Sequence, residues 1–231
     1  MRRLVRSRGF KSWDSTPVMA DSDLPALLSL ASHELRGPVG VVRGYLKMLE
    51  QDASLPERSR KAVLHAAEAG SRLVALLDEV TELSQFKQGA IRLSLRSVSL
   101  RSVLSQAVQA VAIPESVTLD VIAPMDVRVR VEEARMRFAF ERLIGALARA
   151  QNGAVTLELK LVAPRTPKAV PQVVVGIRSL GRGIASERPL DLSRGGMGLS
   201  LALADAVIAA HGGRLRERWL SGRWVGFDVR L

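Results

Sequence analysis

A histidine, a carboxylate and an arginine lie close together near the start of the chain, in the segment 32–38. His33 is followed at once by Glu34, and Arg36 and Pro38 come within the next five residues. An imidazole held in water on a rigid helix can act as a nucleophile, and an adjacent carboxylate can orient it or take its proton during attack. An arginine beside them can steer a phosphoryl group. The segment therefore predicts a nucleophilic histidine.

The apolar residues around His33 indicate the helix that must position it. They recur at alternating steps of four and three, which is the seam of a helix packed in a bundle. If Leu28 takes heptad position a, His33 falls at position f, the farthest from the seam. We therefore expect an exposed histidine on a helix running from about Leu24 to Glu50. The residues of this stripe are Leu24, Leu28, Ala31, Leu35, Pro38, Val42, Tyr45 and Leu49.

A second helix is predicted from about Pro56 to Phe86, after a short loop, and Gly89 closes it. Its apolar stripe has the same spacing as that of the first helix. Two long helices with a short loop form an antiparallel hairpin, and a single hairpin has too little partner surface for both stripes. The sequence therefore predicts a homodimer that forms a four-helix bundle. The second stripe consists of Ala62, Ala66, Ala69, Leu73, Leu76, Val80 and Leu83.

The remainder of the chain alternates between strand and helix patterns. Helices are expected near residues 100–111, 133–150 and 199–211, and strands near 117–122, 127–131, 155–162, 173–177, 214–219 and 224–231. This order favours an α+β chain, in which the hairpin is followed by an α/β sandwich with helices on one face of a mixed sheet. The expected organisation is a basic, disordered arm at 1–20, the helical hairpin at 21–89 and the sandwich at 90–231.

Composition narrows the classes of function. The chain has 231 residues, a net charge of +11 and no cysteine, which excludes disulfides, zinc-thiolate sites and cysteine nucleophiles. Three scattered histidines without clustered carboxylates predict no metal site. No apolar run is long enough to span a bilayer and no secretory signal follows the basic start, so we expect a cytoplasmic protein. Aromatic residues make up only 4%, which gives little support for nucleic-acid binding.

Four segments resemble motifs of the sensor histidine kinase catalytic core, in that family's order. The segment 32–38 resembles the H-box, and 83–89 resembles the end of the dimerisation hairpin. Residues 196–202 resemble the G2 box, and 211–215 resemble the turn after the last helix. The resemblance covers nearly all of the chain from residue 24 onward. It implies a phospho-accepting His33 on the hairpin and an ATPase-like domain of the Bergerat type.

The helix at 135–147 resembles the family's N-box, with two departures. Arg142 and Ala146 stand where the family has asparagines, and the second of those asparagines holds the magnesium that bridges the phosphates. Alanine has no oxygen to offer a hard cation. Arg149 keeps the basic position that follows. The resemblance thus implies a phosphate site without its metal ligand.

The segment 179–183 resembles the G1 box, but Ser179 replaces the aspartate that accepts the adenine amino proton. A serine hydroxyl is shorter and neutral, so it reaches the base poorly. The span 184–195 between the two glycine boxes is also short for the family's lid. The resemblance therefore implies a degenerate nucleotide site, although its last glycine loop can still hold an anion at a helix N-terminus. The vestigial nucleotide loops would contain Gly181, Gly183, Gly196 and Gly198.

The leading hypothesis is a histidine phosphotransfer protein. His33 would exchange a phosphoryl group with the aspartate of a response-regulator receiver domain, assisted by Glu34 and Arg36, and no cofactor would be required. Gly37 replaces the family's Thr or Asn that positions water, so phosphatase activity by that route is not expected. Two alternatives stay open: an active cytosolic kinase that phosphorylates His33 from ATP and magnesium, and a non-catalytic pseudokinase scaffold.

Overall fold

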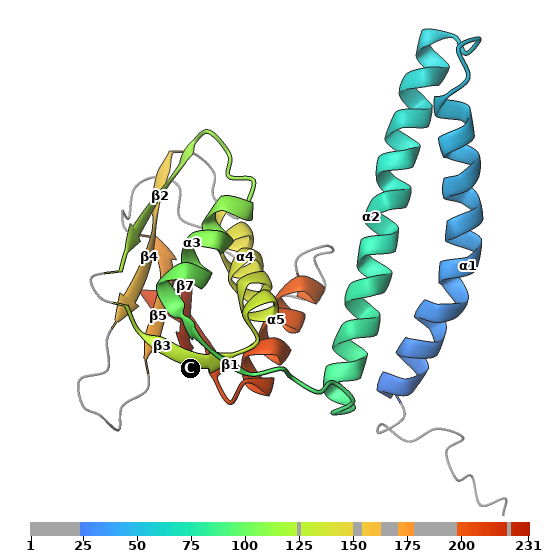
Figure 1. Cartoon of the computed structure of the whole chain (residues 1–231). Coiled ribbons are helices and arrows are strands. Elements are labelled where there is room, and N and C mark those ends of the chain that lie inside the picture. Colours follow the sequence, from blue (N-terminus) through green and yellow to red (C-terminus); the bar gives the residue numbers. More distant parts are fainter. Residues whose placement is uncertain (1–23, 124–125, 150–153, 163–170, 178–197, 221–222) are drawn as a thin grey trace, which may run out of the picture.

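The computed structural model describes residues 24–123, 126–149, 154–162, 171–177, 198–220 and 223–231. The expected arm at 1–20 lies outside these residues. Figure 1 shows a long helical hairpin standing beside a mixed sheet that is covered by helices on the side facing the hairpin. None of the described helices is both long enough and apolar enough to cross a membrane. The predicted α+β class, a hairpin followed by an α/β sandwich, is confirmed.

The hairpin consists of α1 (Leu24–Glu50) and α2 (Glu57–Lys87), which run antiparallel. Pro56 precedes the first residue of α2, where a fixed φ favours helix entry. Gly89 follows α2 with φ of 65°, a left-handed conformation that glycine adopts without a Cβ clash. Its N–H donates to the carbonyl of Phe86, so the turn closes the helix as predicted.

The face on which α1 meets α2 differs from the predicted stripe. One set of shielded residues on α2 repeats at steps of four and three, and the matching set on α1 mixes apolar residues with serines and a glutamate. At Gly70 an added Cβ would lie 3.2 Å from Cγ of Arg43, so the helices approach closely there. These inner residues are Pro25, Ser29, Ser32, Val39, Leu46 and Glu50 on α1, and Val63, Ala67, Gly70, Val74, Leu77, Thr81 and Ser84 on α2.

The larger apolar stripe predicted for the first helix is left exposed by this pairing. Val42 is 55% exposed and Tyr45 is 63% exposed, and Leu28 and Leu35 are exposed as well. Gly70 allows a close approach of α1, and most of the bulky apolar side chains of α1 lie on another side of the helix. Within one chain, the heptad stripe of α1 therefore has no packing role against α2.

In the described part of the sandwich the strand order is β2-β4-β5-β7-β6; β2 and β4 pair in parallel, and the other described neighbours pair antiparallel. A separate two-stranded antiparallel ladder joins β1 and β3. The strands are β1 (Arg96–Ser99), β2 (Val117–Ile122), β3 (Arg128–Val131), β4 (Val155–Val162), β5 (Gln172–Ile177), β6 (Arg214–Leu220) and β7 (Arg223–Arg230). β1 was not expected, because its four residues show little apolar alternation.

Three helices cover one face of this sheet: α3 (Leu100–Ala110), α4 (Glu133–Arg149) and α5 (Gly198–Ala210). Strand β4 alternates between buried and less buried residues, which directs Leu157, Leu159 and Leu161 into the core. Trp224 and Phe227 are fully buried and meet edge to face, with ring centroids 5.1 Å apart. The core therefore lies between the sheet and the helices.

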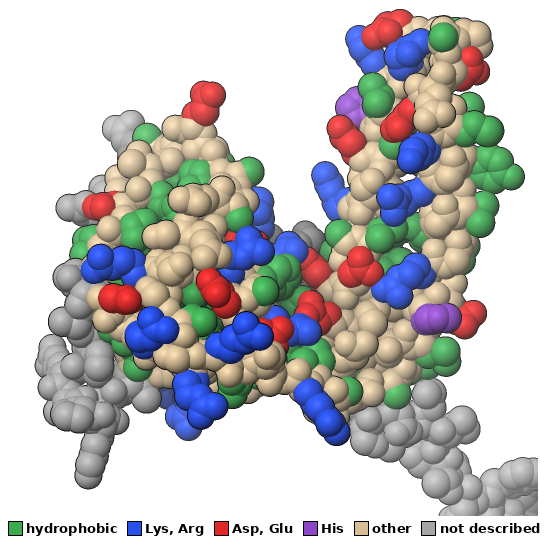
Figure 2. All heavy atoms as spheres, in the orientation of Figure 1, with side chains coloured by type: hydrophobic (Ala, Val, Ile, Leu, Met, Phe, Trp, Pro, Cys, Tyr) green, Lys and Arg blue, Asp and Glu red, His purple; other side chains and the backbone are tan. Residues whose placement is uncertain are grey.

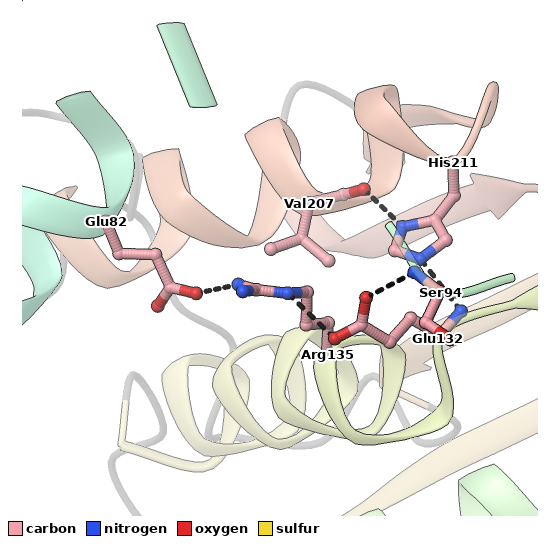
Figure 3. Close-up of polar contacts among 6 residues, drawn as sticks. All are labelled: Glu82, Ser94, Glu132, Arg135, Val207 and His211. Atoms are coloured by element: carbon pink, nitrogen blue, oxygen red, sulfur yellow. Dashed lines mark hydrogen bonds and ion pairs between the residues drawn. The ribbon is translucent and has the colours of Figure 1, made fainter. Parts of the chain in front are cut away.

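His211 joins the end of α5 to the start of α4 (Figure 3). Its Nε2 accepts a hydrogen bond of 3.0 Å from the backbone N–H of Glu132, and its Nδ1 lies 2.7 Å from the carbonyl oxygen of Val207. A ring nitrogen can accept only when it carries no proton. The imidazole is therefore neutral, with its proton on Nδ1 and donated to Val207.

Replacing His211 with alanine removes the acceptor for the Glu132 N–H and leaves that partly buried group unpaired. We expect a loss of about 1–3 kcal/mol in the free energy of unfolding of the sandwich. Urea unfolding followed by tryptophan fluorescence, to which the buried Trp224 contributes, measures it. His65 is an exposed histidine of α2, so His65→Ala is the matched control and should change stability by less than about 0.5 kcal/mol. Equal effects of the two substitutions would contradict the assigned role of His211.

Candidate functional site

His33 lies on α1 with its side chain 79% exposed, as its heptad position predicted. Its Nδ1 is 3.9 Å from Oε1 of Glu34, whose side chain is also exposed. This distance exceeds a hydrogen bond, so the carboxylate contributes a weak electrostatic attraction in this geometry. The structure thus places an imidazole and a carboxylate together on an open surface.

Arg36 occupies the same turn of α1 but reaches toward α2. Its Nη2 donates to Oδ1 of Asp78 at 2.6 Å, and both side chains are partly exposed. Asp78 was not anticipated from the sequence, because nothing in the local pattern relates residues 42 positions apart. The guanidinium carries further N–H donors, so contact with a phosphoryl group near His33 does not require the pair to break. The role of Arg36 in steering remains a prediction.

Beyond His33, helix α1 contains a proline and three glycines, which are unusual residues for a helix interior. Pro38 has no N–H to donate to the carbonyl of Glu34, four residues earlier. Side chains are absent at Gly37, Gly40 and Gly44, and an added Cβ at each of them would meet no atom within 4 Å. Packing among the described residues therefore does not explain these glycines.

A groove lies about two helical turns from His33, between α1 and α2. Its volume is about 470 Å³, and its charged lining residues are Arg43, Lys47 and Glu50. Gly40 and Gly44 form part of its wall, together with Ala67 and Ser71 of α2. The groove therefore combines small residues with a net positive charge.

The nucleotide-related positions are described only in part. Gly181, Gly183 and Gly196 lie outside the described residues, as does Ser179. Gly198 is the first residue of α5 and is buried. Among the described residues, no group of three or more His, Cys, Asp or Glu side chains could hold a metal ion.

The two positions that depart from the N-box pattern both lie on α4. Ala146 is buried and offers no side-chain oxygen. The Arg142 guanidinium lies over the ring of Phe138, 4.4 Å from its centroid. It forms an ion pair of 2.8 Å with Glu79 of α2, a residue that the sequence did not single out. The helix that would face a nucleotide is thus in contact with the hairpin.

Arg149, one helical turn beyond Ala146, belongs to the same electrostatic group. Partial burial, and secondly the nearby Arg142, lower the pKa of the Arg149 guanidinium, whereas Glu79 acts in the opposite direction. Arginine stays charged at neutral pH despite such a shift. The guanidinium groups of Arg142 and Arg149 therefore both interact electrostatically with the Glu79 carboxylate.

Comparison with known proteins agrees with this architecture. Residues 26–89 match the His Kinase A (phospho-acceptor) domain. The chain is 30% identical over 212 residues to the alginate biosynthesis sensor protein KinB of Pseudomonas aeruginosa, covering 87% of this chain and 36% of that protein. It is 29% identical over 196 residues to the sensor protein DivL of Caulobacter vibrioides, covering 79% of this chain and 24% of that protein. The chain thus spans a minor part of these relatives' length.

Solved structures show the same fold. Full-length ShkA in complex with AMPPNP has a TM-score of 0.68 at 22% identity, covering 89% of this chain and 45% of that one. The Acinetobacter baumannii histidine kinase AdeS has a TM-score of 0.58 at 19% identity, covering 86% of this chain and 96% of that one. With its phospho-acceptor hairpin followed by this sandwich, the chain is a histidine kinase catalytic core and belongs to the two-component signalling proteins.

Proposed function

We propose that this chain is a phosphotransfer protein in which His33 exchanges a phosphoryl group with the aspartate of a response-regulator receiver domain. The observation that carries the proposal is the open imidazole beside Glu34 on a helix of the phospho-acceptor domain. Nδ1 is the ring nitrogen nearer Glu34, so Nε2 is the nitrogen expected to attack. An N–P bond forms, the P–O bond of the aspartyl phosphate breaks, and the receiver carboxylate leaves. The imidazolium proton passes to Glu34 or to water.

The described part of the ATPase-like domain supports transfer without a nucleotide. Ala146 provides no ligand for magnesium, and Arg142 is engaged by Glu79. An aspartyl phosphate is already activated, so the reaction requires neither ATP nor a metal on this chain. The nucleotide site is accordingly proposed to be degenerate, and His33 to be the phospho-acceptor.

The groove that lies about two helical turns from His33 supports a receiver domain as the partner. Arg43 and Lys47 make it basic, and the glycines of α1 permit close approach of another backbone. A receiver domain with an acidic docking face would fit this surface. Its reactive aspartate would then be brought to the histidine on the same side of α1.

An active kinase is the second candidate. Relatives of this chain are named sensor histidine kinases, and the similar ShkA structure contains the ATP analogue AMPPNP. In that case ATP and magnesium would supply the phosphoryl group. A non-catalytic scaffold is the third candidate, and it would tolerate the loss of His33.

The exposed stripe of α1 supports a homodimer. Bulky apolar side chains gather along the outer edge of the hairpin in Figure 2, with Val42 and Tyr45 among the most exposed. Fully burying such a side chain stabilises an interface by about 1.5–3 kcal/mol. The inner seam is already used between α1 and α2, so the larger stripe is available to a second copy. Two hairpins would then form a four-helix bundle.

Label transfer tests the phosphotransfer role. The chain is mixed with receiver domains from the same genome that carry labelled aspartyl phosphate, and separately with labelled ATP and magnesium. We expect acid-labile label on the chain from a receiver and none from ATP. His33→Gln should abolish the label, whereas His65→Gln, an exposed histidine on α2, should retain it. Label from ATP would establish the kinase, and label from neither donor would leave the scaffold; either result overturns the proposal.

Light scattering coupled to gel filtration tests the dimer. The expected mass is twice the 25.1 kDa of one chain. Val42→Glu puts a charge into the proposed interface and should give a monomer, since burying an unpaired charge is costly. Val121→Glu changes an exposed valine on β2 and should leave the dimer intact. A monomeric parent protein would refute the four-helix bundle.

A further inference from the structure

Helix α2 carries a second contact surface in addition to its seam with α1. Glu79, Glu82 and Phe86 repeat at steps of three and four, so they lie on one side of the helix. Each touches the sandwich: Glu79 pairs with Arg142, Glu82 pairs with Arg135, and Arg135 also lies over the Phe86 ring. We call Glu79, Glu82 and Phe86 the docking stripe. It faces α4 and the neighbouring α5.

The docking stripe and the α1 seam occupy opposite sides of α2. Successive residues of a helix are turned by about 100°, so Gly70 and Thr81 of the seam point about half a turn away from Glu79. Figure 1 shows the same arrangement, with α2 standing between α1 and the sandwich. The sandwich is therefore held on the side of the hairpin that is remote from the helix of His33.

Glu79 is the buried member of the stripe. One oxygen pairs with Arg142 at 2.8 Å, and the other accepts a hydrogen bond of 2.8 Å from the Ser200 hydroxyl near the start of α5. Both carboxylate oxygens are thus satisfied by two different helices of the sandwich. A buried charge that loses its partner costs several kcal/mol, so this contact favours full engagement or full separation.

Glu82 makes a more exposed contact of a different character. Its ion pair with Arg135 is partly open to solvent, and Arg135 also binds Glu132, which accepts a hydrogen bond from the backbone N–H of Ser94 (Figure 3). Ser94 belongs to the segment that connects α2 to the sandwich. This second contact therefore fixes the connecting segment, whereas Glu79 fixes the helices α4 and α5.

We propose that Glu79 and Arg142 are positioning residues for phosphotransfer. Their ion pair holds the α4–α5 face against α2, and this keeps the sandwich away from α1 so that the His33 imidazole stays open to a partner domain. An asparagine at position 142 would be shorter and uncharged, so it could not form this ion pair. Arg142 thus has a structural role, the ion pair with Glu79, that an asparagine could not perform. The claim that the position of the sandwich matters for phosphotransfer rests on the proposed function. The claim that the ion pair holds the sandwich against α2 does not.

Distance measurement between two spin labels tests the placement. The chain has no cysteine, so Arg58→Cys on α2 and Gln109→Cys on α3 provide two unique and exposed labelling sites. Pulsed electron paramagnetic resonance is recorded with labelled chain diluted in excess unlabelled chain, so that distances within one chain dominate. A single narrow distance distribution is expected. A broad one would overturn the proposal.

Charge reversal then tests the ion pair. Arg142→Glu or Glu79→Arg alone places like charges together, so the distribution should shift and broaden. The double variant Glu79→Arg/Arg142→Glu restores opposite charges and should restore the narrow distribution. Arg130→Glu makes the same change at an exposed position of β3 and should have no effect. Identical distributions in all variants, or a double variant no narrower than the single ones, would overturn the proposal.

If a charge-reversal variant does not fold, two milder variants test the same contact. Glu79→Gln keeps the shape of the side chain without its charge, and Ser200→Ala removes only the hydroxyl donor. We expect Glu79→Gln to broaden the distribution more than Ser200→Ala. The reverse order would contradict a role for the charge. Tryptophan fluorescence, to which the buried Trp224 contributes, verifies that each sandwich is folded.

Transfer rates link the placement to function. Phosphoryl transfer from a receiver to His33 should fall several-fold in either single reversal and recover in the double variant. If His33 is never labelled while the distance pattern holds, the proposed function fails and the positioning pair stands. If His33 is labelled equally in all variants while the distances shift, the ion pair positions the sandwich but not for transfer, and the inference is wrong.

Discussion

Helix α2 has to satisfy two partners at once, and the rest of the structure depends on how it divides its surface between them. Each residue of a helix points to one side, so contacts on opposite sides of α2 must be made by different residues. One side is small and apolar or weakly polar, and it lets α1 approach closely at Gly70. The other side carries buried and half-buried carboxylates that bind arginines of α4. The sandwich and α1, the helix of His33, are thus kept apart by α2, whose two faces differ chemically.

Local patterns were sufficient for much of this fold. The four-three spacing predicted both long helices, and the heptad position predicted the exposure of His33. The strand expected at 155–162 is β4, with the same bounds. These features depend on neighbours within a few turns or residues, which is the range over which a sequence pattern carries information.

Other features depend on residues far apart in the chain. Two adjacent stripes of α2 share the same period, and periodicity alone does not indicate which of them faces α1. The partners Asp78 for Arg36 and Glu79 for Arg142 follow from tertiary packing and have no local signal. In the N-box pattern, Arg142 is simply a missing asparagine. In the folded chain, Arg142 forms an ion pair with the buried Glu79.

The glycines of α1 have a consequence for how this signalling helix is ordered. Gly37, Gly40 and Gly44 each cost a helix interior roughly 0.5–1 kcal/mol relative to alanine, and within the chain their missing side chains relieve no clash. Pro38 removes a further backbone hydrogen bond in the same region. The helical segment that bears His33 is therefore intrinsically weak and draws its order from whatever packs on it. If the proposed dimer forms, folding of that segment and assembly become one coupled equilibrium, and the order of the segment around His33 would then rise with protein concentration.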